Sequence, residues 1–298
     1  MRNSKKILSN FYNLRTWRNG DQRAPHKPLL VLYALGQLLN GKKSFFYEEA
    51  EEELKELLME FGPLRSHYSP EYPFWRMKKD GIWNLKNHND VVENSSGDVN
   101  RTNLILNKVA GGFDNKVLVE FQNDRTKIFD IVKFLLEDNF PDSMHDDILE
   151  AVCIDYESTL RKVKKKRDPK FRNRILNAYE YKCAICGFDV RLNNRTIGLE
   201  AAHIKWHQAG GPDIERNGIA LCTMHHKLFD IGAFSLVAED SNFYSKISDR
   251  VSGTNGFDEW LMRFNNQPIA KPQRKIYYPE QTFCQWHVAE VFKGYGRD

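Results

Sequence analysis

Two pairs of metal-binding side chains constrain this chain more than any other feature of its sequence. Cys183 and Cys186 form a Cys-x-x-Cys pair, and Cys222 and His225 form a Cys-x-x-His pair further along. Two such pairs match the ligand set of a closed, tetrahedral zinc site, which often serves only to hold a fold together. Here His226 directly follows the last ligand, so the zinc site would fix its position without needing it as a ligand.

Length and composition describe an ordinary globular protein. The 298 residues suggest about two domains, and 41% hydrophobic content is enough to bury real cores. The net charge of +4 is too small to indicate a partner. We see no signal peptide and no apolar run that could span a membrane. Cys153 and Cys284 lie far apart, without disulfide-rich spacing, so we expect a reduced, cytoplasmic protein whose paired cysteines hold metal.

The chain is expected to have three parts. Residues 1–145 form a helix-rich domain, residues 146–170 a basic linker, and residues 171–298 a domain around the metal-binding pairs, with an aromatic C-terminal extension. Every residue from 161 to 167 except Val163 is a lysine or an arginine. Such a run is often a solvated helix face, but directly before the metal-binding pairs it favours a polyphosphate partner.

Hydrophobic spacing predicts the main elements and an α+β fold class. In the first domain it predicts a buried helix over 28–39 and two amphipathic helices over 48–61 and 126–138. Between them it predicts a β-hairpin with an Asp-Gly turn over 74–86. In the last domain it predicts a helix over 171–181 and a strand over 199–203. The start of a second helix follows over 222–230, and a second strand over 234–237. The aromatic residues of 250–298 should pack around this second core.

The segment from Lys182 to Phe234 resembles the HNH endonucleases, also called ββα-metal nucleases. The matching text is Lys-Cys-Ala-Ile-Cys-Gly, then Leu-Glu-Ala-Ala-His-Ile, then Asn-Gly-Ile-Ala-Leu-Cys-Thr-Met-His-His-Lys-Leu-Phe-Asp. The segment is especially similar to the bacterial restriction-type branch, which includes the modification-dependent McrA-like enzymes. The resemblance implies a zinc-stapled nuclease that hydrolyses phosphodiester bonds with one further metal ion.

The chemistry of these residues agrees with that resemblance. Phosphodiester hydrolysis needs an activated water, neutralised phosphate charge and help for the leaving oxygen. His203, at the end of the predicted strand, is the candidate general base, since neutral imidazole accepts a proton near pH 7. Taken alone it would be interpreted as a buried, hydrogen-bonded histidine. The resemblance implies that Asn217 orients the loop carrying the base and that His226 binds the catalytic ion.

The chain departs from the family pattern at two places. The usual pattern ends in Cys-x-x-Cys-His, whereas here His225 and His226 follow Cys222; we assign His225 to zinc and His226 to catalysis, and the sequence alone also permits the reverse. Many members carry an acidic metal ligand directly before the base, where this chain has Ala202. Strand alternation puts Glu200 on the same face, so it supplies either that carboxylate or a structural salt bridge.

Three further polar residues lie in this stretch. His207 could approach the metal or the phosphate, although a place in a surface loop is favoured; Asp230 is expected to cap or brace the helix, and Asp213 has no predicted role. With so few protein ligands, water and phosphate oxygens would fill most coordination positions of the catalytic ion, which Mg²⁺ or Mn²⁺ tolerates. The structural ion would be Zn²⁺.

Two motifs in the first domain, RAPHKPLL at 23–30 and EYPFWR at 71–76, accompany the HNH segment. Together with it, they are similar to the sulfur-binding domains of phosphorothioate-dependent type IV restriction endonucleases. The resemblance implies that Tyr72 and Pro73 form an apolar wall for sulfur, with His26 and Lys27 as a basic pair beside it. Arg23 and Arg76 would make further phosphate contacts.

The proposed sulfur site is physically reasonable. A phosphorothioate carries sulfur in place of one non-bridging oxygen, and an apolar cup accepts the less hydrated sulfur at lower desolvation cost. Residue chemistry alone also allows Pro25 and Pro28 simply to start a helix, and Tyr72-Pro73 to be a turn. Some relatives have arginine where this chain has Lys27, and its planar guanidinium grips phosphate differently.

Three functions are therefore compared. The leading hypothesis is a modification-dependent endonuclease that reads phosphorothioate in double-stranded DNA and cuts nearby, with two copies on the DNA for a double-strand break. A second is an HNH nuclease that reads methylated or hydroxymethylated cytosine, in an aromatic cage for which Trp17, Trp75 and Trp83 are candidates. A third is a non-cutting DNA-binding protein whose zinc and histidines are structural.

Overall fold

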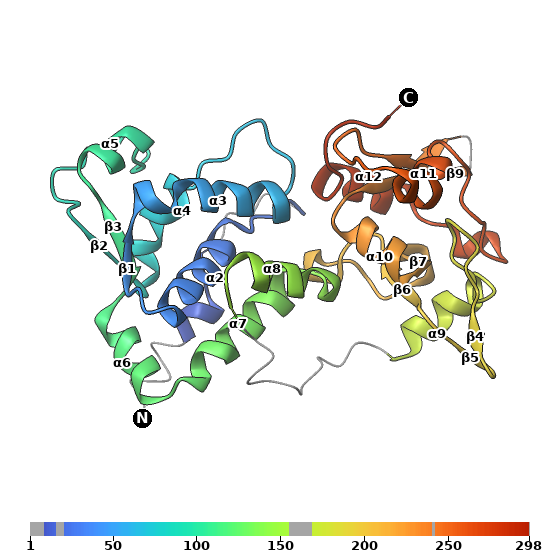
Figure 1. Cartoon of the computed structure of the whole chain (residues 1–298), viewed down its shortest axis with the longest axis horizontal. Helices are drawn as coiled ribbons and strands as arrows, with labels where there is room; N and C mark the ends of the chain where they lie inside the picture. The colour runs from blue at the N-terminus through green and yellow to red at the C-terminus, as the bar shows by residue number, and fades with distance from the viewer. Residues whose placement is uncertain (1–8, 16–20, 155–168, 240–241, 298) are drawn as a thin grey trace. The chain divides into compact units, whose positions relative to one another are not determined.

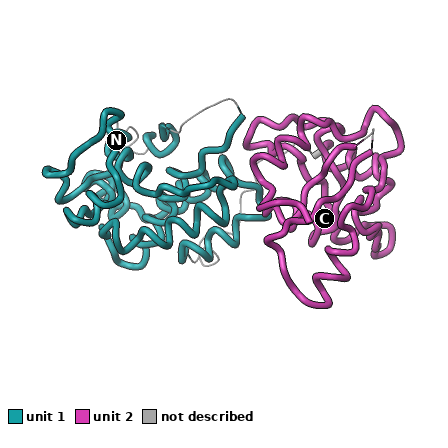
Figure 2. Tube along the Cα trace, turned by 90° about the horizontal axis from the view of Figure 1, so that it is seen from above, with its two compact units in different colours: residues 1–162 teal, residues 163–298 magenta. Residues whose placement is uncertain are grey.

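The computed structural model describes residues 9–15, 21–154, 169–239 and 242–297. The chain divides into two compact units, Met1–Lys162 and Val163–Asp298 (Figure 2). The basic run at 161–167 and Trp17 lie outside the described residues, so their predicted roles stay predictions. Among the helices of the described ranges, none has the length and apolar character that crossing a bilayer requires.

Unit 1 consists of helices around a three-stranded antiparallel sheet (Figure 1). Its elements in chain order are α2 (His26–Leu39), β1 (Ser44–Phe46), α3 (Tyr47–Phe61), α4 (Glu71–Arg76), the 3₁₀ helix η1 (Met77–Asp80), β2 (Trp83–Lys86), α5 (Arg101–Leu106), β3 (Ala110–Phe113), α6 (Asn115–Asn123), α7 (Thr126–Asn139), the 3₁₀ helix η2 (Asp142–Met144) and α8 (His145–Ala151). The strand order is β1-β3-β2.

The three predicted helices of unit 1 are confirmed as α2, α3 and α7. Every residue of α2 from Lys27 to Gly36 is buried. Pro28 lies in its first turn, where amide groups have no intrahelical partner, so proline removes no hydrogen bond there. α3 buries Leu54, Leu57 and Phe61 on one face and starts with glutamates, which the N-terminal end of the helix dipole favours.

The predicted β-hairpin over 74–86 is wrong. Phe74 lies in α4, η1 follows directly, and β2 pairs with β3 instead of with a neighbouring hairpin strand. Asp80-Gly81 does supply a positive dihedral, since Gly81 has a φ of 72°. A glycine in this conformation also ends helices, and here it ends η1. The same dipeptide therefore fits both structures, and the short segment carries too little periodicity to decide between them.

The sheet of unit 1 packs a cluster of aromatic rings. Phe74 meets Trp83 with ring centroids 5.7 Å apart, and Trp83 meets Phe113 at 5.9 Å, both edge to face. Phe45 on β1 joins the same cluster. These rings come from α4 and all three strands, so α4 is held firmly against the sheet.

The folded part of unit 1 continues beyond residue 145, where the predicted domain ended. Ile148 and Leu149 are buried in α8, and Val152 and Ile154 are buried after it. A Cβ on Gly36 would lie 1.9 Å from the carbonyl oxygen of Val152, so this close approach requires glycine in α2. The start of the predicted linker therefore belongs to the fold of unit 1.

Unit 2 contains small antiparallel sheets and the helices packed on them. Its elements are α9 (Pro169–Ala178), β4 (Arg191–Leu192), β5 (Arg195–Thr196), β6 (Leu199–His203), η3 (His207–Ala209), η4 (Glu215–Asn217), β7 (Gly218–Cys222), α10 (Thr223–Asp230), β8 (Phe234–Glu239), β9 (Asn242–Ile247), α11 (Asn255–Trp260), η5 (Met262–Phe264), η6 (Lys275–Tyr277) and α12 (Gln281–Glu290). Strands pair as β4-β5, β6-β7 and β8-β9.

The predicted ββα arrangement is confirmed in β6, β7 and α10. β6 and β7 are antiparallel, with Leu199 opposite Cys222 and His203 opposite Gly218. Because α10 starts directly after Cys222, the pairing brings both ends of β6 beside candidate site residues. Of the C-terminal aromatic residues, Trp286 packs against Trp206 as predicted, whereas Trp260 is 44% exposed. The mixed fold class of helices and small sheets is therefore confirmed.

Candidate active site and nucleic-acid interface

Four side chains of unit 2 form a cluster that could hold a metal ion. The ligand atoms of Cys183, Cys186, Cys222 and His225 all lie within 4.8 Å of one another. The amide of Ala184 donates to the carbonyl oxygen of Ala220 at 2.8 Å and so ties the first cysteine pair to β7. Zinc binds cysteine sulfur at about 2.3 Å and histidine nitrogen at about 2.0–2.1 Å. Three thiols and one imidazole at this spacing fit such an ion.

The fold also decides which of the two adjacent histidines belongs to this cluster. His225 is fully buried, and its Nδ1 lies 3.1 Å from Cys222 Sγ. Its Nε2 donates to the carbonyl oxygen of Trp260 at 3.0 Å, which leaves the Nδ1 lone pair for a metal. His226 lies outside the cluster, because successive residues of α10 point in different directions.

His226 lies between two carboxylates. Its Nδ1 is 2.6 Å from Glu200 Oε2, and its Nε2 is 3.2 Å from Asp230 Oδ2. Asp230 is one turn further along α10 and its side chain is only 3% exposed, whereas that of Glu200 is 44% exposed. Glu200, on the neighbouring strand β6, is therefore the more open of the two carboxylates.

The two carboxylates control the charge of His226. Burial disfavours the protonated ring, but Asp230 and then Glu200 outweigh burial and raise the pKa of His226 to about 10. The same pairing lowers the pKa of Glu200. A metal ion binds only the neutral ring, so an ion here would replace the proton between His226 Nδ1 and Glu200 Oε2. The donors on that side are then one imidazole nitrogen and one carboxylate, and carboxylate oxygens suit Mg²⁺ and Mn²⁺. The carboxylate of Glu200, which strand alternation predicted on the same face as residue 202, thus lies beside His226.

His203 lies at the end of β6 and its ring is held from two sides. The ring stacks on Phe171 of α9, with centroids 4.2 Å apart and planes 9° apart. Its Nε2 is 2.7 Å from Asp213 Oδ1. His207 is close by, with ring centroids 5.9 Å apart. Sequence reasoning gave Asp213 no role, and only the return of the loop toward β6 reveals its contact.

Asn217 connects the two ends of the loop between β6 and β7. It is fully buried, and its Oδ1 accepts from the amide of Lys205 at 2.8 Å. Its Nδ2 donates to the carbonyl oxygens of Lys205 and Pro212, both at 3.0 Å. Gly211 passes so close that a Cβ there would lie 1.9 Å from the Lys205 oxygen. The side chain of Asn217 thus holds the segment after His203 against the segment before Asp213.

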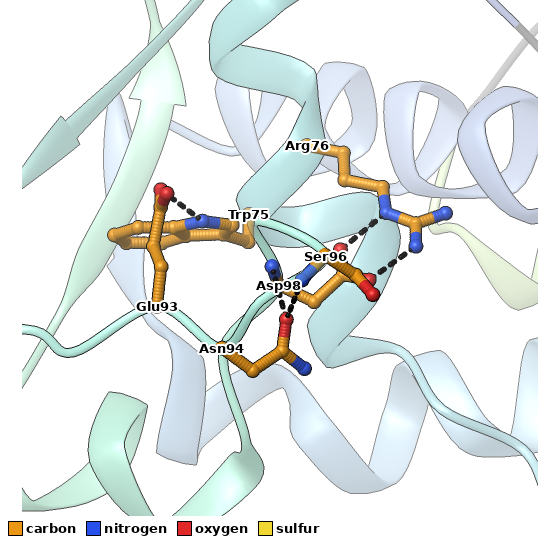
Figure 3. Close-up of polar contacts among 6 residues, drawn as sticks. All are labelled: Trp75, Arg76, Glu93, Asn94, Ser96 and Asp98. Carbon is orange, nitrogen blue, oxygen red and sulfur yellow. Dashed lines mark hydrogen bonds and ion pairs between the residues drawn. The ribbon is translucent and has the colours of Figure 1, made fainter.

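In unit 1, two side chains of the EYPFWR motif, Tyr72 and Arg76, are exposed next to each other. Tyr72 is 39% exposed on α4, while Pro73 beside it is buried. The guanidinium of Arg76 lies 5.3 Å from the centre of the Tyr72 ring. Figure 3 shows the same guanidinium facing the carboxylate of Asp98, with which it makes a bidentate ion pair. Arg76 is therefore held next to Tyr72 by a contact that its position in the sequence does not reveal.

The loop that carries Asp98 is itself ordered by hydrogen bonds. Asn94 Oδ1 accepts from the amides of Ser96 and Asp98, at 2.9 and 3.0 Å (Figure 3). Glu93 accepts from the indole nitrogen of Trp75 at 3.0 Å. The loop and α4 thus form one polar network around Arg76.

The other predicted reader residues are more enclosed than expected. Lys27 is buried and its Nζ is paired with the carboxylate of Asp80. Burial, and then the positive charge of Arg65, lower the pKa of His26. Arg23 donates to the carbonyl oxygen of Phe61 at 2.8 Å. A buried lysine needs an anionic partner, so the apolar surroundings of Lys27 were the signal that could have suggested its pairing.

Comparison with known proteins identifies both units. The family model "ScoMcrA-like, DNA sulfur-binding domain" matches residues 4–157, and the family model "HNH endonuclease" matches residues 183–237. No curated protein matches the chain.

Several solved structures are similar. The sulfur-binding domain of ScoMcrA, solved with phosphorothioated DNA, has 17% identity and a TM-score of 0.43, covering 49% of this chain and 97% of that one. The sulfur-binding domain of SprMcrA, also with phosphorothioated DNA, has 20% identity and a TM-score of 0.42, covering 50% and 93%. The type IV phosphorothioation-dependent restriction endonuclease ScoMcrA has 16% identity and a TM-score of 0.43, covering 56% and 33%. Since the sulfur-binding model alone spans more than half of the 298 residues, the chain belongs to the ScoMcrA-like family of DNA sulfur-binding domains, and it carries an HNH endonuclease domain after that domain.

Proposed function

We propose that this chain is a type IV restriction endonuclease that binds phosphorothioate-modified double-stranded DNA through unit 1 and hydrolyses a nearby phosphodiester through the HNH site of unit 2. One observation carries the proposal: a sulfur-binding domain and an HNH domain follow each other in a single chain. A reader and a nuclease joined in this way restrict cleavage to the neighbourhood of the modification.

The nuclease half of the proposal is supported by the placement of three residues. His203 is the group that takes the proton of the attacking water, and Asn217 holds the loop on which it depends. His226, with Glu200, provides the protein ligands for the catalytic ion. A divalent ion bound there supplies positive charge for the phosphate and the leaving oxygen. We assign this ion as Mg²⁺ or Mn²⁺ and the ion of the Cys183 cluster as Zn²⁺.

Asp230 provides a prediction for the ion site. It accepts from Nε2 of His226, and so keeps Nδ1 turned toward Glu200. Partners of this kind typically change metal affinity about 10–100-fold when removed. We expect Asp230→Asn to raise the Mn²⁺ concentration for half-maximal cleavage by about that factor, while zinc content stays unchanged. Glu239→Gln, in the exposed end of β8, is the control. An unaltered Mn²⁺ dependence would show that Asp230 only stabilises α10 and does not affect the ion site.

The reader half rests on the apolar surface of Tyr72 beside a fixed cation. Sulfur is weakly hydrated, so the exposed ring of Tyr72 suits it better than it suits oxygen. Pro73, predicted to share this apolar wall, is buried and does not belong to the surface. Arg76, held by Asp98 and 45% exposed at its side chain, lies close enough to Tyr72 to meet the adjacent phosphate charge. Such contacts position the duplex and weaken with salt.

The structure changes the proposed roles of the basic pair. Lys27 is committed to Asp80 inside unit 1, so we propose that it orders the loop at Arg15, whose amide also contacts Asp80 at 3.1 Å. His26, with its lowered pKa, is neutral near pH 7 and would act as a hydrogen-bond partner, not as a charge. Arg23 and Arg76 remain the proposed phosphate contacts.

The sulfur site predicts the outcome of a gel-shift competition. Wild-type protein should bind duplexes with one Rp phosphorothioate more tightly than unmodified duplexes, and Tyr72→Ala should reduce this preference about tenfold, or about 1.4 kcal/mol. Leu106→Ala, which removes a side chain 75% exposed elsewhere on unit 1, is the matched control. Equal preference in wild type and Tyr72→Ala would remove Tyr72 from the sulfur site.

The same competition tests the alternative of a modified cytosine. An aromatic cage needs open ring faces, but Trp75 and Trp83 are only 2% and 4% exposed. Trp75 is further covered by Lys78, whose Nζ lies 3.6 Å from the ring centre. We therefore expect duplexes with methylated or hydroxymethylated cytosine to compete no better than unmodified DNA. Double-strand breaks would need two active sites, so we also propose that two copies act together on DNA.

A further inference from the structure

We propose that Asp213 is a positioning residue for the general base, and that His203 and Asp213 act as a histidine–carboxylate pair. The inference rests on the proposed nuclease function and adds a residue to it. Asp213 Oδ1 lies 2.7 Å from His203 Nε2, and their side chains are only 28% and 12% exposed. The contact is therefore mostly shielded from water, where charge and hydrogen bonding act more strongly than at an open surface.

The ring of His203 has little freedom to turn away from this contact. Phe171 covers one face, stacked at 4.2 Å with nearly parallel planes. The backbone of His203 is fixed opposite Gly218 at the end of the β6–β7 pair. Phe171 and Asp213 thus occupy one face and one edge of the ring and restrict its rotation.

Asp213 is itself held from both sides. The preceding residue, Pro212, gives its carbonyl oxygen to Asn217, and Asp213 gives its own to Arg174 of α9 at 2.7 Å. Arg174 also pairs with Glu215 two residues later, at 3.2 Å. By holding this loop, the buried side-chain amide of Asn217 also positions the carboxylate of Asp213 beside the imidazole of His203.

This geometry determines the proton transfer. With Nε2–H donating to Asp213, the lone pair of the neutral ring is on Nδ1, which takes the proton from the attacking water. The water oxygen forms its bond to phosphorus as that O–H bond breaks, and the bond from phosphorus to the leaving oxygen breaks in turn; the leaving oxygen takes a proton from solvent. Asp213 stays ionised and stabilises the imidazolium that results.

The test compares cleavage and binding in Asp213→Asn and Asp213→Glu, using the full chain and a phosphorothioate duplex. The asparagine amide can turn its NH₂ toward Nε2 and favour the opposite tautomer. We expect Asp213→Asn to lower kcat about 10–100-fold at unchanged KM, with unchanged zinc content, the range found for partners that orient metal-bound imidazoles. Asp213→Glu should recover part of the loss. Asp258→Asn, exposed on α11, should cut at the wild-type rate.

Nitrogen NMR of the His203 ring adds a readout that a purely structural role would not move. Wild type should show the tautomer protonated at Nε2, and Asp213→Asn should shift the population away from it. Three results would each overturn the proposal while leaving the nuclease intact: wild-type or faster cleavage by Asp213→Asn, full recovery of that variant by extra Mn²⁺, or an unchanged tautomer. No cleavage by wild type would instead reject the proposed function itself.

Discussion

Replacing His203 with alanine is expected to lower cleavage about 10²–10⁴-fold, the usual contribution of a general base. DNA affinity should not change, because the proposed reader residues all lie in unit 1. The fold should also survive, since the hydrogen bonds of Asn217 go to Lys205 and Pro212 and none involves the His203 ring. The measurement is single-turnover cleavage of a phosphorothioate duplex, together with gel-shift affinity for the same duplex.

The matched control is His207→Ala. Its ring lies 5.9 Å from that of His203, in η3, so the variant removes an imidazole from the same neighbourhood without removing the proposed base. We expect that variant to cut within a few-fold of wild type. Wild-type cleavage by His203→Ala would end its assignment as the base, and cleavage of no duplex by wild-type protein would favour the non-cutting DNA-binding alternative.

Replacing Cys183 with serine should unfold unit 2. Cys183 is fully buried in the four-residue cluster, and a serine hydroxyl does not replace a thiolate as a zinc ligand. A structural zinc ion contributes about 10–16 kcal/mol to the folding of small metal-binding domains. The whole stability of a domain is about 5–15 kcal/mol, so the loss is too large for the remaining core to offset. We expect protein without bound zinc, largely insoluble and inactive in cleavage.

Metal analysis and thermal unfolding check this prediction, with Cys153→Ser as the control. Cys153 is an exposed free thiol at the end of unit 1 and has no part in the cluster, so its variant should keep zinc, solubility and melting behaviour. A Cys183→Ser protein with full zinc content and wild-type melting temperature would contradict the role of the cluster as the staple of unit 2.

The Cys183 cluster and the ββα arrangement were predictable because their signals are local. Cysteine and histidine pairs separated by two residues have few structural uses. The strand between the two pairs and the helix at the second pair follow from short hydrophobic patterns. Glu200 could be placed on the right face by strand alternation alone. The roles of His225 and His226 could not be decided in this way, because they depend on which ring lies with the three thiols and which lies beside Glu200.

The three long helices of unit 1 were equally predictable, but its shorter helices and its reader surface were not. α2, α3 and α7 carry long apolar patterns, whereas the short α4 was mistaken for a strand because Asp-Gly fits both a hairpin turn and a helix end. Lys27 was predicted to contact DNA because the resemblance to sulfur-binding domains implied a basic pair there. Its actual partner, Asp80, lies far along the chain, and no pattern in the sequence joins them.

The amino-acid sequence by itself determined which reactive groups the chain carries: the cysteines and histidines of the Cys183 cluster, the candidate base, and the motifs of a reader followed by a nuclease. The tertiary structure alone decided which charges are available for that chemistry. It took Lys27 into a buried ion pair, fixed Arg76 against Asp98, and brought Asp213 to His203. The physical reason is that residue types and their short-range spacing are properties of the chain, while burial and ion pairing depend on which distant segments fold against each other.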